Sequence, residues 1–417
     1  MRELGHHLVS MEEVQKTILS HVSEVDAEER ILADCVGRVL RQDVTAQEHL
    51  PPFDNSAMDG FGVRTGDLSD VSKEQPVTLP VGQRVQAGDP GDQPLVAGEA
   101  VRIMTGAPIP EGVEAVVPHE LTTYDDSNVT FTQPVRDGQN VRRCGEDFRP
   151  GDVAMQSGTV LHGPRLGVCG TLGWARLKMS RSLRVAILSP GDELVEVGEP
   201  CGPGQIRNGN AYSLRGALAG LGAKPISLGI TPDRPDAVRE AISQAFADGA
   251  DAIVSTGGVS AGDFDFVQAV VREDADPAFV FKVAMRPGKP QVFGLYDGKP
   301  LFGLPGNPAA SVISFELLVR PALRKMRGET LVHEPRFGVR FPFAYKYPSG
   351  RVFLLRTQIV PDEEDPRGGF RVEKPGAQGS GLMRSLATAN AIVILPADLG
   401  QVEPGDVFPA QWIGGRP

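Results

Sequence analysis

The chain has 417 residues, 41% of them hydrophobic and 23% charged, a composition that is ordinary for a globular protein with several domains. Asp and Glu (53) outnumber Lys and Arg (42), and the net charge of −11 disfavours nonspecific binding to nucleic acid or to acidic membranes. The four cysteines form no CxxC pair, which argues against a thiolate zinc site and against a disulfide framework. Because the sequence also lacks an apolar signal core and any run of about 18 apolar residues, we expect a soluble cytoplasmic protein that binds no membrane.

The first predicted element is a helix that begins after Ser10. Ser10 and Glu13 have the spacing of a capping box, in which each side chain bonds the backbone N–H of the other residue. Val14, Ile18 and Val22 recur at the spacing of one helical face. The segment is therefore predicted to be an amphipathic helix.

A second short helix is expected over residues 27–36, because Gly37 stands directly after the segment as a stop signal. Residues 46–145 differ in character: short β-rich runs alternate with Pro and Gly turns, which predicts a small β domain. Within it, the string PPFDNSAMDGFGVR at residues 51–64 places polar side chains behind two prolines with no helical or strand period. Such a stretch, which includes Asp59, fits a loop offered to a ligand rather than a core.

Between residues 180 and 327, apolar strands alternate with amphipathic helices, a pattern typical of βαβ units and a parallel, doubly wound sheet. One of these helices is predicted to be capped by Asn210 and to end at Gly222. Residues 328–417 return to short β runs and predict a β-barrel-like C-terminal domain. The predicted fold class is therefore multidomain α/β, with β-rich domains flanking a doubly wound α/β domain.

Polar residues and glycines directly follow four of the predicted strands. In an open parallel sheet, ligands bind at the carboxyl ends of the strands. Ordinary turn chemistry explains any one of these loops equally well, but the convergence of four loops at one edge favours a binding site. The residues are Asp192, Glu193, Asp233, Ser260, Asp263, Asp265 and Asn307.

Two of the loops have the features of an anion site. Gly257 and Gly258, in TGGVSAGD, allow backbone N–H groups to approach an anion closely. In LPGNPAAS, Asn307 suits an N-cap and Pro308 the first helical position, so the helix N-terminus favours a phosphate. A role for Asn307 in capping alone remains an alternative.

A cluster of cations follows further along the chain. Lys282, Arg286 and Lys289 lie within eight residues around a Pro-Gly turn, which suggests an oxyanion site in a protein of net charge −11. A solvated edge turn is the alternative interpretation.

Carboxylates beside cations become compatible when a divalent metal lies between them. Mg²⁺ takes one or two carboxylates together with phosphate oxygens, and Asp233 and Asp265, with Glu193, are able to supply these. The histidines are scattered and form no metal pattern, and neither a GxSxG elbow nor a GxxxxGK[ST] phosphate loop occurs. Serine-based hydrolysis and P-loop ATP chemistry therefore lack their usual signatures.

Several longer motifs occur in one order along the chain: PPFDNSAMDGFGVR, VRIMTGAPIPEGVEAVVP, RRCGEDFRPGD, SPGDEL, GGVSAGDFDFV, RPGKP, LPGNPAASV and SLATANAIVILP. With them the chain resembles the molybdopterin molybdenumtransferases of molybdenum-cofactor biosynthesis, a family that includes the bacterial MoeA proteins and the E domain of gephyrin. The resemblance covers nearly the full length.

The resemblance implies an elongated homodimer of four-part subunits whose α/β domain is of the molybdopterin-binding type. It implies that the active site lies between the second part of one subunit and the third and fourth parts of the other, so that Asp59 faces the partner's α/β loops. The parts are a helical linker domain (1–45 and 146–178), an inserted β-rich domain (46–145), the α/β domain (179–327) and the C-terminal β-barrel-like domain (328–417).

The resemblance also implies the reaction. Molybdate is inserted at the dithiolene of adenylated molybdopterin and AMP is released, with Mg²⁺ or another divalent cation assisting. The adenylated substrate comes from molybdopterin adenylyltransferase, a transient partner built on the same α/β fold. No nucleic acid is involved.

Matched position by position, the resemblance implies a set of functional residues. The catalytic acids are Asp59, Glu193, Asp233 and Asp265, of which Asp233 and Asp265 bind the metal. The supporting and substrate-binding residues are Thr105, Asp147, Lys282, Arg286, Lys289, Pro305, Pro308, Arg356 and Ser380. The loop chemistry described above adds Gly257, Gly258, Ser260 and Asn307 to the substrate-binding set. Arg356 and Ser380 resemble positions that help to hold molybdate.

The sequence departs from the family pattern at three places, one of which is the GSG at residues 379–381. Arg286 stands where many members have Lys, and Ala310 lacks a hydroxyl that members commonly carry after LPGN. Three other functions compete with the transferase: the adenylyltransferase itself, a scaffold without catalysis, and a nucleotide-cleaving enzyme that shares only the α/β domain. The sequence reads GGVS where the adenylyltransferases have GGTG, which argues against the first function. It lacks the long linkers of a scaffold, which argues against the second, and residues 46–145 argue against the third.

Overall fold

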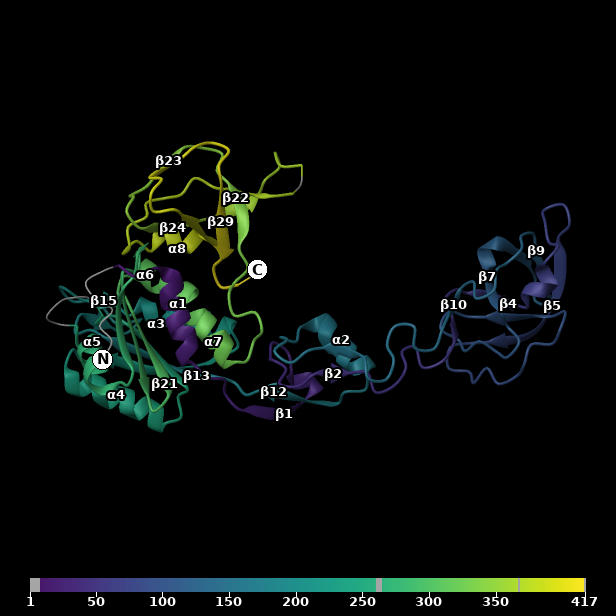
Figure 1. Ribbon diagram of the computed structural model, residues 1–417, viewed down its shortest axis with the longest axis horizontal. Helices are drawn as coiled ribbons and strands as arrows, with labels where there is room; N and C mark the ends of the chain where they lie inside the picture. The colour runs from purple at the N-terminus through teal and green to yellow at the C-terminus, as the bar shows by residue number, and fades with distance from the viewer. Residues whose placement is uncertain (1–7, 260–264, 367, 416–417) are drawn as a thin grey trace. The chain divides into compact units, whose positions relative to one another are not determined.

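The computed structural model describes residues 8–259, 265–366 and 368–415, and the chain divides into two compact units (Figure 1). The large unit is built from Met1–Gln42, Ser157–His162 and Arg176–Pro417, and the small unit from Asp43–Gln156 and Gly163–Ala175. No helix within the described ranges has the length and apolar character needed to cross a membrane.

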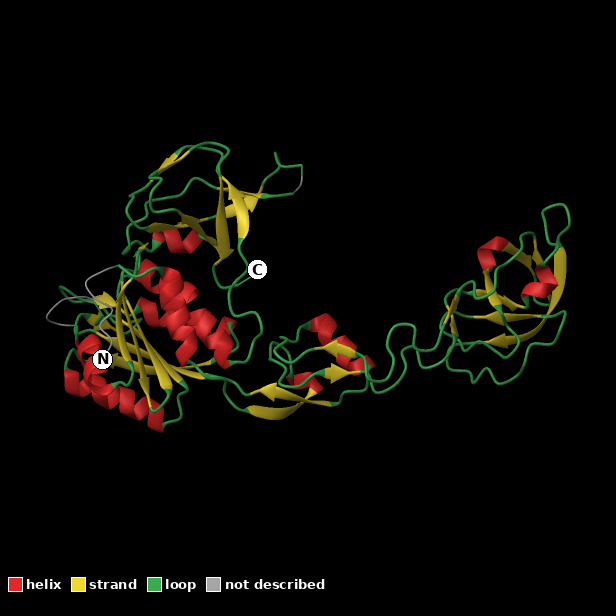
Figure 2. Cartoon of the chain, viewed as in Figure 1, coloured by secondary structure: helices red, strands yellow, loops and turns green. Residues whose placement is uncertain are grey.

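The small unit is dominated by strands (Figure 2). Its main sheet has the order β7-β4-β6-β5-β9-β8, and its core includes the buried Phe61 and Phe131. Two short antiparallel pairs, β3 with β10 and β2 with β11, one α-helix and two 3₁₀ turns, η2 Thr65–Leu68 and η3 His119–Leu121, complete it. The elements are β2 Val44–Thr45, β3 Asn55–Ser56, β4 Gly60–Val63, β5 Val77–Val85, β6 Ala100–Ile103, β7 Ala115–Pro118, β8 Thr122–Tyr124, β9 Asn128–Phe131, β10 Val141–Arg142, β11 Val153–Met155 and α2 Gly163–Thr171.

Gly60 allows strands β4 and β7 to approach closely. A Cβ atom on Gly60 would lie 2.1 Å from the carbonyl oxygen of Val117. We therefore expect Gly60→Ala to push the strands apart and to lower the free energy of unfolding by about 1–3 kcal/mol, measured by urea denaturation. Gly66→Ala is the control, because a Cβ there meets nothing within 4 Å. Equal stability of the two variants would contradict the prediction.

The large unit contains a six-stranded sheet of order β16-β13-β17-β21-β20-β18. The first four strands are parallel neighbours, as predicted, whereas β20 runs antiparallel to both β21 and β18. The sheet is thus not parallel throughout, because a two-residue turn joins β20 to β21 and the segment that contains β19, rather than a crossover helix, joins β18 to β20. The strands are β13 Arg184–Pro190, β16 Lys224–Thr231, β17 Ala252–Thr256, β18 Ala278–Lys282, β20 Pro290–Tyr296 and β21 Lys299–Leu304.

Helices cover both faces of this sheet, which confirms the doubly wound α/β class (Figure 1). Helices α4 and α5 pack on one face, and α1, α3, α6 and α7 on the other. The last two are joined by a π-helical turn, η4, so that helical structure continues from Pro308 to Met326. The helices are α1 Met11–His21, α3 Gly209–Gly220, α4 Pro235–Ala247, α5 Phe266–Asp274, α6 Pro308–Ser314, η4 Phe315–Val319 and α7 Arg320–Met326.

Helix α1 begins as predicted. Ser10 is its N-cap, and the Ser10 hydroxyl accepts a hydrogen bond of 3.1 Å from the N–H of Glu13. Val14 and Ile18 are buried in the core on one face of the α/β sheet. The amide of Gln15 donates a 2.7 Å hydrogen bond to the carbonyl of Leu317, in the π-helical turn. Helix α1 thus packs within the large unit, and the predicted four-part division stays a prediction.

Two local predictions were wrong. Residues 27–31 form β1 (Ala27–Ile31) rather than a helix, because they pair antiparallel with the distant β12 (Arg176–Ser180), and only a 3₁₀ turn, η1 Leu32–Asp34, follows. Asn208, not Asn210, occupies the N-cap position of helix α3, and its side chain makes no capping hydrogen bond. The short strand β15 (Ile206–Arg207) pairs with β14 (Leu194–Val195) and leads the chain into the helix two residues earlier.

The C-terminal part of the large unit is a seven-stranded sheet of order β19-β24-β27-β29-β22-β26-β25. Its edge strand β19 comes from the turn with the predicted cations and pairs parallel with β24. The α/β part and the C-terminal sheet are therefore joined by backbone hydrogen bonds at this turn. The elements are β19 Met285–Arg286, β22 Phe337–Arg340, β23 Tyr345–Lys346, β24 Val352–Thr357, β25 Ile359–Pro361, β26 Phe370–Val372, α8 Arg384–Thr388, β27 Ala391–Leu395, β28 Gln401–Val402 and β29 Val407–Trp412.

Candidate active site

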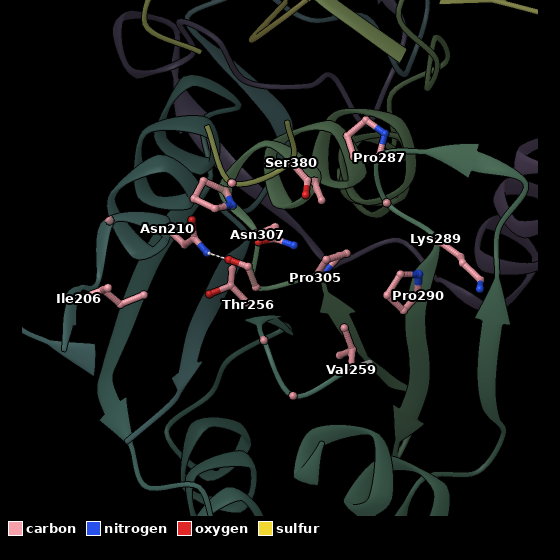
Figure 3. A pocket seen from close by; sticks show the side chains of 18 of the residues that line it. Ile206, Asn210, Thr256, Val259, Pro287, Lys289, Pro290, Pro305, Asn307 and Ser380 are labelled. Carbon is pink, nitrogen blue, oxygen red and sulfur yellow. Dashed lines mark hydrogen bonds between the residues drawn. The ribbon is translucent and has the colours of Figure 1, made fainter. Parts of the chain in front are cut away.

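A cavity of about 1080 Å³ lies at the carboxyl ends of the parallel strands β13, β16, β17 and β21 (Figure 3). The turn that contains β19 and a segment of the C-terminal part, residues 378–383, also contribute to its lining. The convergence of strand-end loops expected from the sequence is therefore present. The predicted residues in the lining are Glu193, Asp233, Gly257, Gly258, Asp265, Arg286, Lys289, Pro305, Asn307, Pro308 and Ser380.

The remaining predicted residues lie elsewhere. Lys282 ends β18 at the base of the turn, and Arg356 is buried in β24, so neither lines the cavity. Asp59, Thr105 and Asp147 belong to the small unit. Ser260 and Asp263 fall outside the described residues.

Sequence reasoning missed several residues of the lining. Asn210 was assigned to a helix cap, and Arg351 lies at the start of β24 with no motif around it. The only available signal for Arg351 was a basic residue before an apolar strand, which says nothing of the pairing between β24 and β19. The residues missed include Ile206, Arg207, Asn208, Asn210, Arg351 and Gln378.

The acids on the strand ends share one electrostatic environment. The N–H of Asp192 donates to the Asp233 carboxylate at 3.3 Å, and the N–H of Asp233 donates to the Asp192 carboxylate at 3.2 Å. Burial raises the pKa of Asp233, and the carboxylates of Glu193, Asp192 and Asp265 raise it further against the bond from Asp192 N–H. A cation bound among these acids would relieve their mutual repulsion.

The donor set fits a hard divalent cation only in part. Across the described residues, no three His, Cys, Asp or Glu side chains come together as a metal site. Asp233 and Asp265 nevertheless both line the cavity, and two carboxylates are what Mg²⁺ takes when substrate phosphates and water supply the other ligands. These residues therefore suit a metal that arrives with its substrate.

The basic turn presents its cations to the cavity. Its base is closed by a 2.7 Å hydrogen bond from Val283 N–H to the Lys289 carbonyl. Arg286 and Lys289 are exposed, and neither forms an ion pair with any residue that the structure describes. The Arg351 guanidinium lines the same cavity and reaches the Met285 carbonyl at 3.5 Å. Several cations without carboxylate partners at one end of a cavity favour an oxyanion ligand over a solvated turn.

The loop before helix α6 is held from two sides. Asn307 occupies the N-cap position, but its side chain makes no capping hydrogen bond, so the alternative of a pure capping role was wrong. The amide of Asn210 donates 2.8 Å to the Gly306 carbonyl (Figure 3), and Ala309 N–H donates 3.0 Å to the Ser380 carbonyl. One of the N–H groups expected to bind phosphate is thus already used, and it fixes Ser380 beside the cavity.

Arg356 is a buried cation, only 1% exposed. Its Nε donates to the Ser385 hydroxyl and its Nη2 to the Gly379 carbonyl, both at 3.1 Å. Its Nη1 has no hydrogen-bond partner within the described ranges, and burial lowers the pKa of Arg356. The side chain therefore lies behind the segment that carries Ser380 and holds it in place.

Two predicted residues of the small unit lie together. The backbone N–H and the hydroxyl of Thr105 both donate to one carboxylate oxygen of Asp59, each at 2.7 Å. These bonds, the backbone one foremost, lower the pKa of Asp59, which is exposed and ionised at neutral pH. Asp54, in the same loop, accepts hydrogen bonds of 2.7 Å from Cys144 N–H and Arg143. The polar loop is thus rigidly held with Asp59 facing solvent.

Three family models match the chain. They describe the MoeA N-terminal region with domains I and II over residues 9–173, a probable molybdopterin binding domain over 186–325, and the MoeA C-terminal region, domain IV, over 339–412.

Named relatives agree with these models. A molybdopterin molybdenumtransferase of Haemophilus influenzae is 36% identical over 90% of this chain and 91% of its own length. One of Bacillus subtilis is 33% identical over 95% of this chain and 92% of its own. The chain belongs to the molybdopterin molybdenumtransferase family.

A solved member of the family supports the fold. The crystal structure of the molybdopterin biosynthesis moeA protein from Pyrococcus horikoshii OT3 is 27% identical and matches 97% of this chain and 100% of that chain with a TM-score of 0.82. Membership of the family confirms the resemblance and the multidomain α/β class that the sequence predicted. The roles of single residues stay predictions.

Proposed function

We propose that this molybdopterin molybdenumtransferase family member inserts molybdate into adenylated molybdopterin and releases AMP, with Mg²⁺ assisting. The names of its relatives support the type of reaction. The observation that carries the proposal is one cavity that has, at one end, cations without an ion-pair partner among the described residues and, on its strand-end loops, carboxylates. Its volume of about 1080 Å³ lies at the upper end of the range for small-molecule sites and suits a nucleotide-sized substrate.

The cationic end suits the oxyanions. Arg286 offers a planar fork of N–H donors to an oxyanion, and Lys289 adds a second positive charge. The hydroxyl of Ser380, on the segment held by Arg356, lies in the same lining. We assign molybdate to this end.

The carboxylates on the strand-end loops are assigned to the divalent cation and to the reacting groups. Asp233 and Asp265 would hold the divalent cation, and Glu193 positions the attacking or leaving group. Mg²⁺, when bound, neutralises charge on the substrate's phosphates. Without such a cation, three carboxylates would repel those phosphates.

We propose that the site is completed in a homodimer. Two hydrogen bonds from Thr105 hold the ionised Asp59 carboxylate in place, yet both residues belong to the small unit, which does not contain the cavity. The exposed Asp59 and Asp147 of the small unit would face the cavity of the partner subunit. A molybdopterin adenylyltransferase is the proposed transient source of substrate, and the four free cysteines support a reducing cytoplasmic location.

The test of the reaction is incubation with adenylated molybdopterin, molybdate and Mg²⁺. AMP should be released only when molybdate is present. ATP consumption with unmodified molybdopterin would instead identify an adenylyltransferase. If neither substrate reacts, a scaffold without catalysis is the remaining function.

Arg286→Ala should raise the molybdate concentration needed for half-maximal AMP release. One lost charge-assisted hydrogen bond changes affinity by about 10- to 150-fold. Arg215→Ala is the matched control, because Arg215 is an exposed arginine of helix α3 outside the lining and its loss changes the net charge equally. An unchanged molybdate dependence in Arg286→Ala would show that the turn does not bind molybdate and would favour the alternative, a solvated edge turn.

A further inference from the structure

A buried amide lies directly beneath the basic turn. Gln291, the second residue of β20, is 2% exposed. Its Nε2 donates a 2.8 Å hydrogen bond to the Gly288 carbonyl, at the tip of the turn, and a 2.6 Å hydrogen bond to the hydroxyl of Ser314, which is fully buried in helix α6. One side chain therefore joins the turn that carries the cations to the helix that begins at the cavity.

The tip of the turn depends on this contact. Gly288 has a φ of +102°, and a Cβ there would come within 2.5 Å of the Met285 methyl and 2.9 Å of the Ser314 hydroxyl. The tip is thus pressed against the buried Met285 and Ser314, with its carbonyl directed at the Gln291 amide. Without that donor the Gly288 carbonyl would be buried and unsatisfied, and the turn would have to shift to reach another partner.

The other supports of the turn hold its ends rather than its tip. Val283 N–H and the Lys289 carbonyl close the base, and the pairing of Met285 and Arg286 with β24 holds the first half. Between Arg286 and Lys289, the bond from Gln291 is the one side-chain hydrogen bond to a backbone carbonyl that the described residues make.

We propose that Gln291 is a positioning residue for the oxyanion: it holds the Arg286–Lys289 tip against the end of helix α6 and so sets the affinity for molybdate. Gln291 does not line the cavity and acts only through Gly288 and Ser314. This inference rests on the proposed function, because it takes the basic turn to be where molybdate binds. A shift of the tip would move both cations together, and oxyanion contacts are sensitive to displacements of about 0.5 Å.

The variant Gln291→Met keeps the size and flexibility of the side chain and removes both hydrogen bonds. We expect the KM for molybdate to rise about 10-fold while kcat changes by less than about twofold. Ser314→Ala removes one of the two bonds and leaves the bond to Gly288 intact, so a rise of about threefold is expected. The double variant should equal Gln291→Met, because both substitutions act on the same contact.

Gln15→Met is the matched control. Gln15 is also a buried glutamine, and its amide also donates to a backbone carbonyl of the α6–α7 helical segment, that of Leu317, away from the turn. It should lower the melting temperature as Gln291→Met does and leave the KM for molybdate unchanged.

The outcomes separate the two proposals when Arg286→Ala is assayed beside these variants. A raised KM in Arg286→Ala and a normal one in Gln291→Met overturns the positioning role and leaves the proposed function standing. A normal KM in both variants overturns both. An equal rise in Gln15→Met and Gln291→Met assigns the effect to lost stability and overturns the positioning role. If Gln291→Met does not fold, Ser314→Ala decides, and a normal KM in it overturns the inference.

Discussion

Mixing Asp59→Asn subunits with Asp265→Asn subunits is expected to restore activity that neither variant has alone. Each variant by itself should lose at least about 100-fold in AMP release, the usual scale for an acid that acts in the chemical step. In the proposed two-fold dimer, each site uses Asp59 of one protomer and Asp265 of the other. A heterodimer then has one site with both acids intact and one with neither. Random exchange should restore about a quarter of the sites, and isolated heterodimers should have about half of their sites intact.

The measurement is AMP release from heterodimers isolated through two different tags. Asp59→Asn mixed with Thr105→Ala is the matched control, because both substitutions fall on the small unit and every site of that heterodimer keeps one defect. The control should show no recovery. Isolated Asp59→Asn/Asp265→Asn heterodimers that stay inactive would rule out a site shared between subunits.

Asp265→Asn should weaken activation by Mg²⁺ more than it weakens the fold. Asp265 lines the cavity, and its carboxylate raises the pKa of Asp233, so the two acids repel each other in the absence of a cation. The substitution keeps the size and removes one charge. We expect the Mg²⁺ concentration for half-maximal activity to rise by at least about 10- to 100-fold, with little change in unfolding measured without metal.

AMP release titrated against Mg²⁺ checks this prediction. Asp274→Asn is the control, since Asp274 ends the same helix α5 but pairs with Arg239 at 2.8 Å, outside the cavity. It should titrate with Mg²⁺ as the unsubstituted protein does. Normal Mg²⁺ dependence and turnover in Asp265→Asn would remove Asp265 from the metal site and leave it a structural role at the start of α5.

The elements that the sequence predicted well are those whose signals are local. The capping box of Ser10 and Glu13, and the proline after Asn307, mark helix starts within four residues, and both helices begin there. The acids of the strand-end loops were also accessible, because a parallel sheet sends the carboxyl ends of its strands to one edge whatever the details of packing.

The sequence could not show what depends on distant pairing. Residues 27–31 have helix-forming side chains, yet they form β1, because β12 lies almost 150 residues later and its pairing overrides local preference. Arg351 and Gln378 enter the cavity only because β24 pairs with β19 of the basic turn. The amide of Gln291 is likewise a contact between two segments whose proximity no local pattern encodes.

The packing of helix α1 has a consequence for the protein's synthesis. The helix is the first described element to leave the ribosome, but the α6–α7 segment that covers its apolar face is synthesised much later. The hydrogen-bond partner of Gln15, for example, lies 302 residues downstream. At typical translation rates that interval is on the order of tens of seconds. The small unit, encoded entirely inside the interval, contains its own cores and is able to fold meanwhile. We therefore expect nascent chains that end before Pro308 to hold a folded small unit and a helix α1 that lacks its α6–α7 partner, which makes α1 a segment that a chaperone is able to bind.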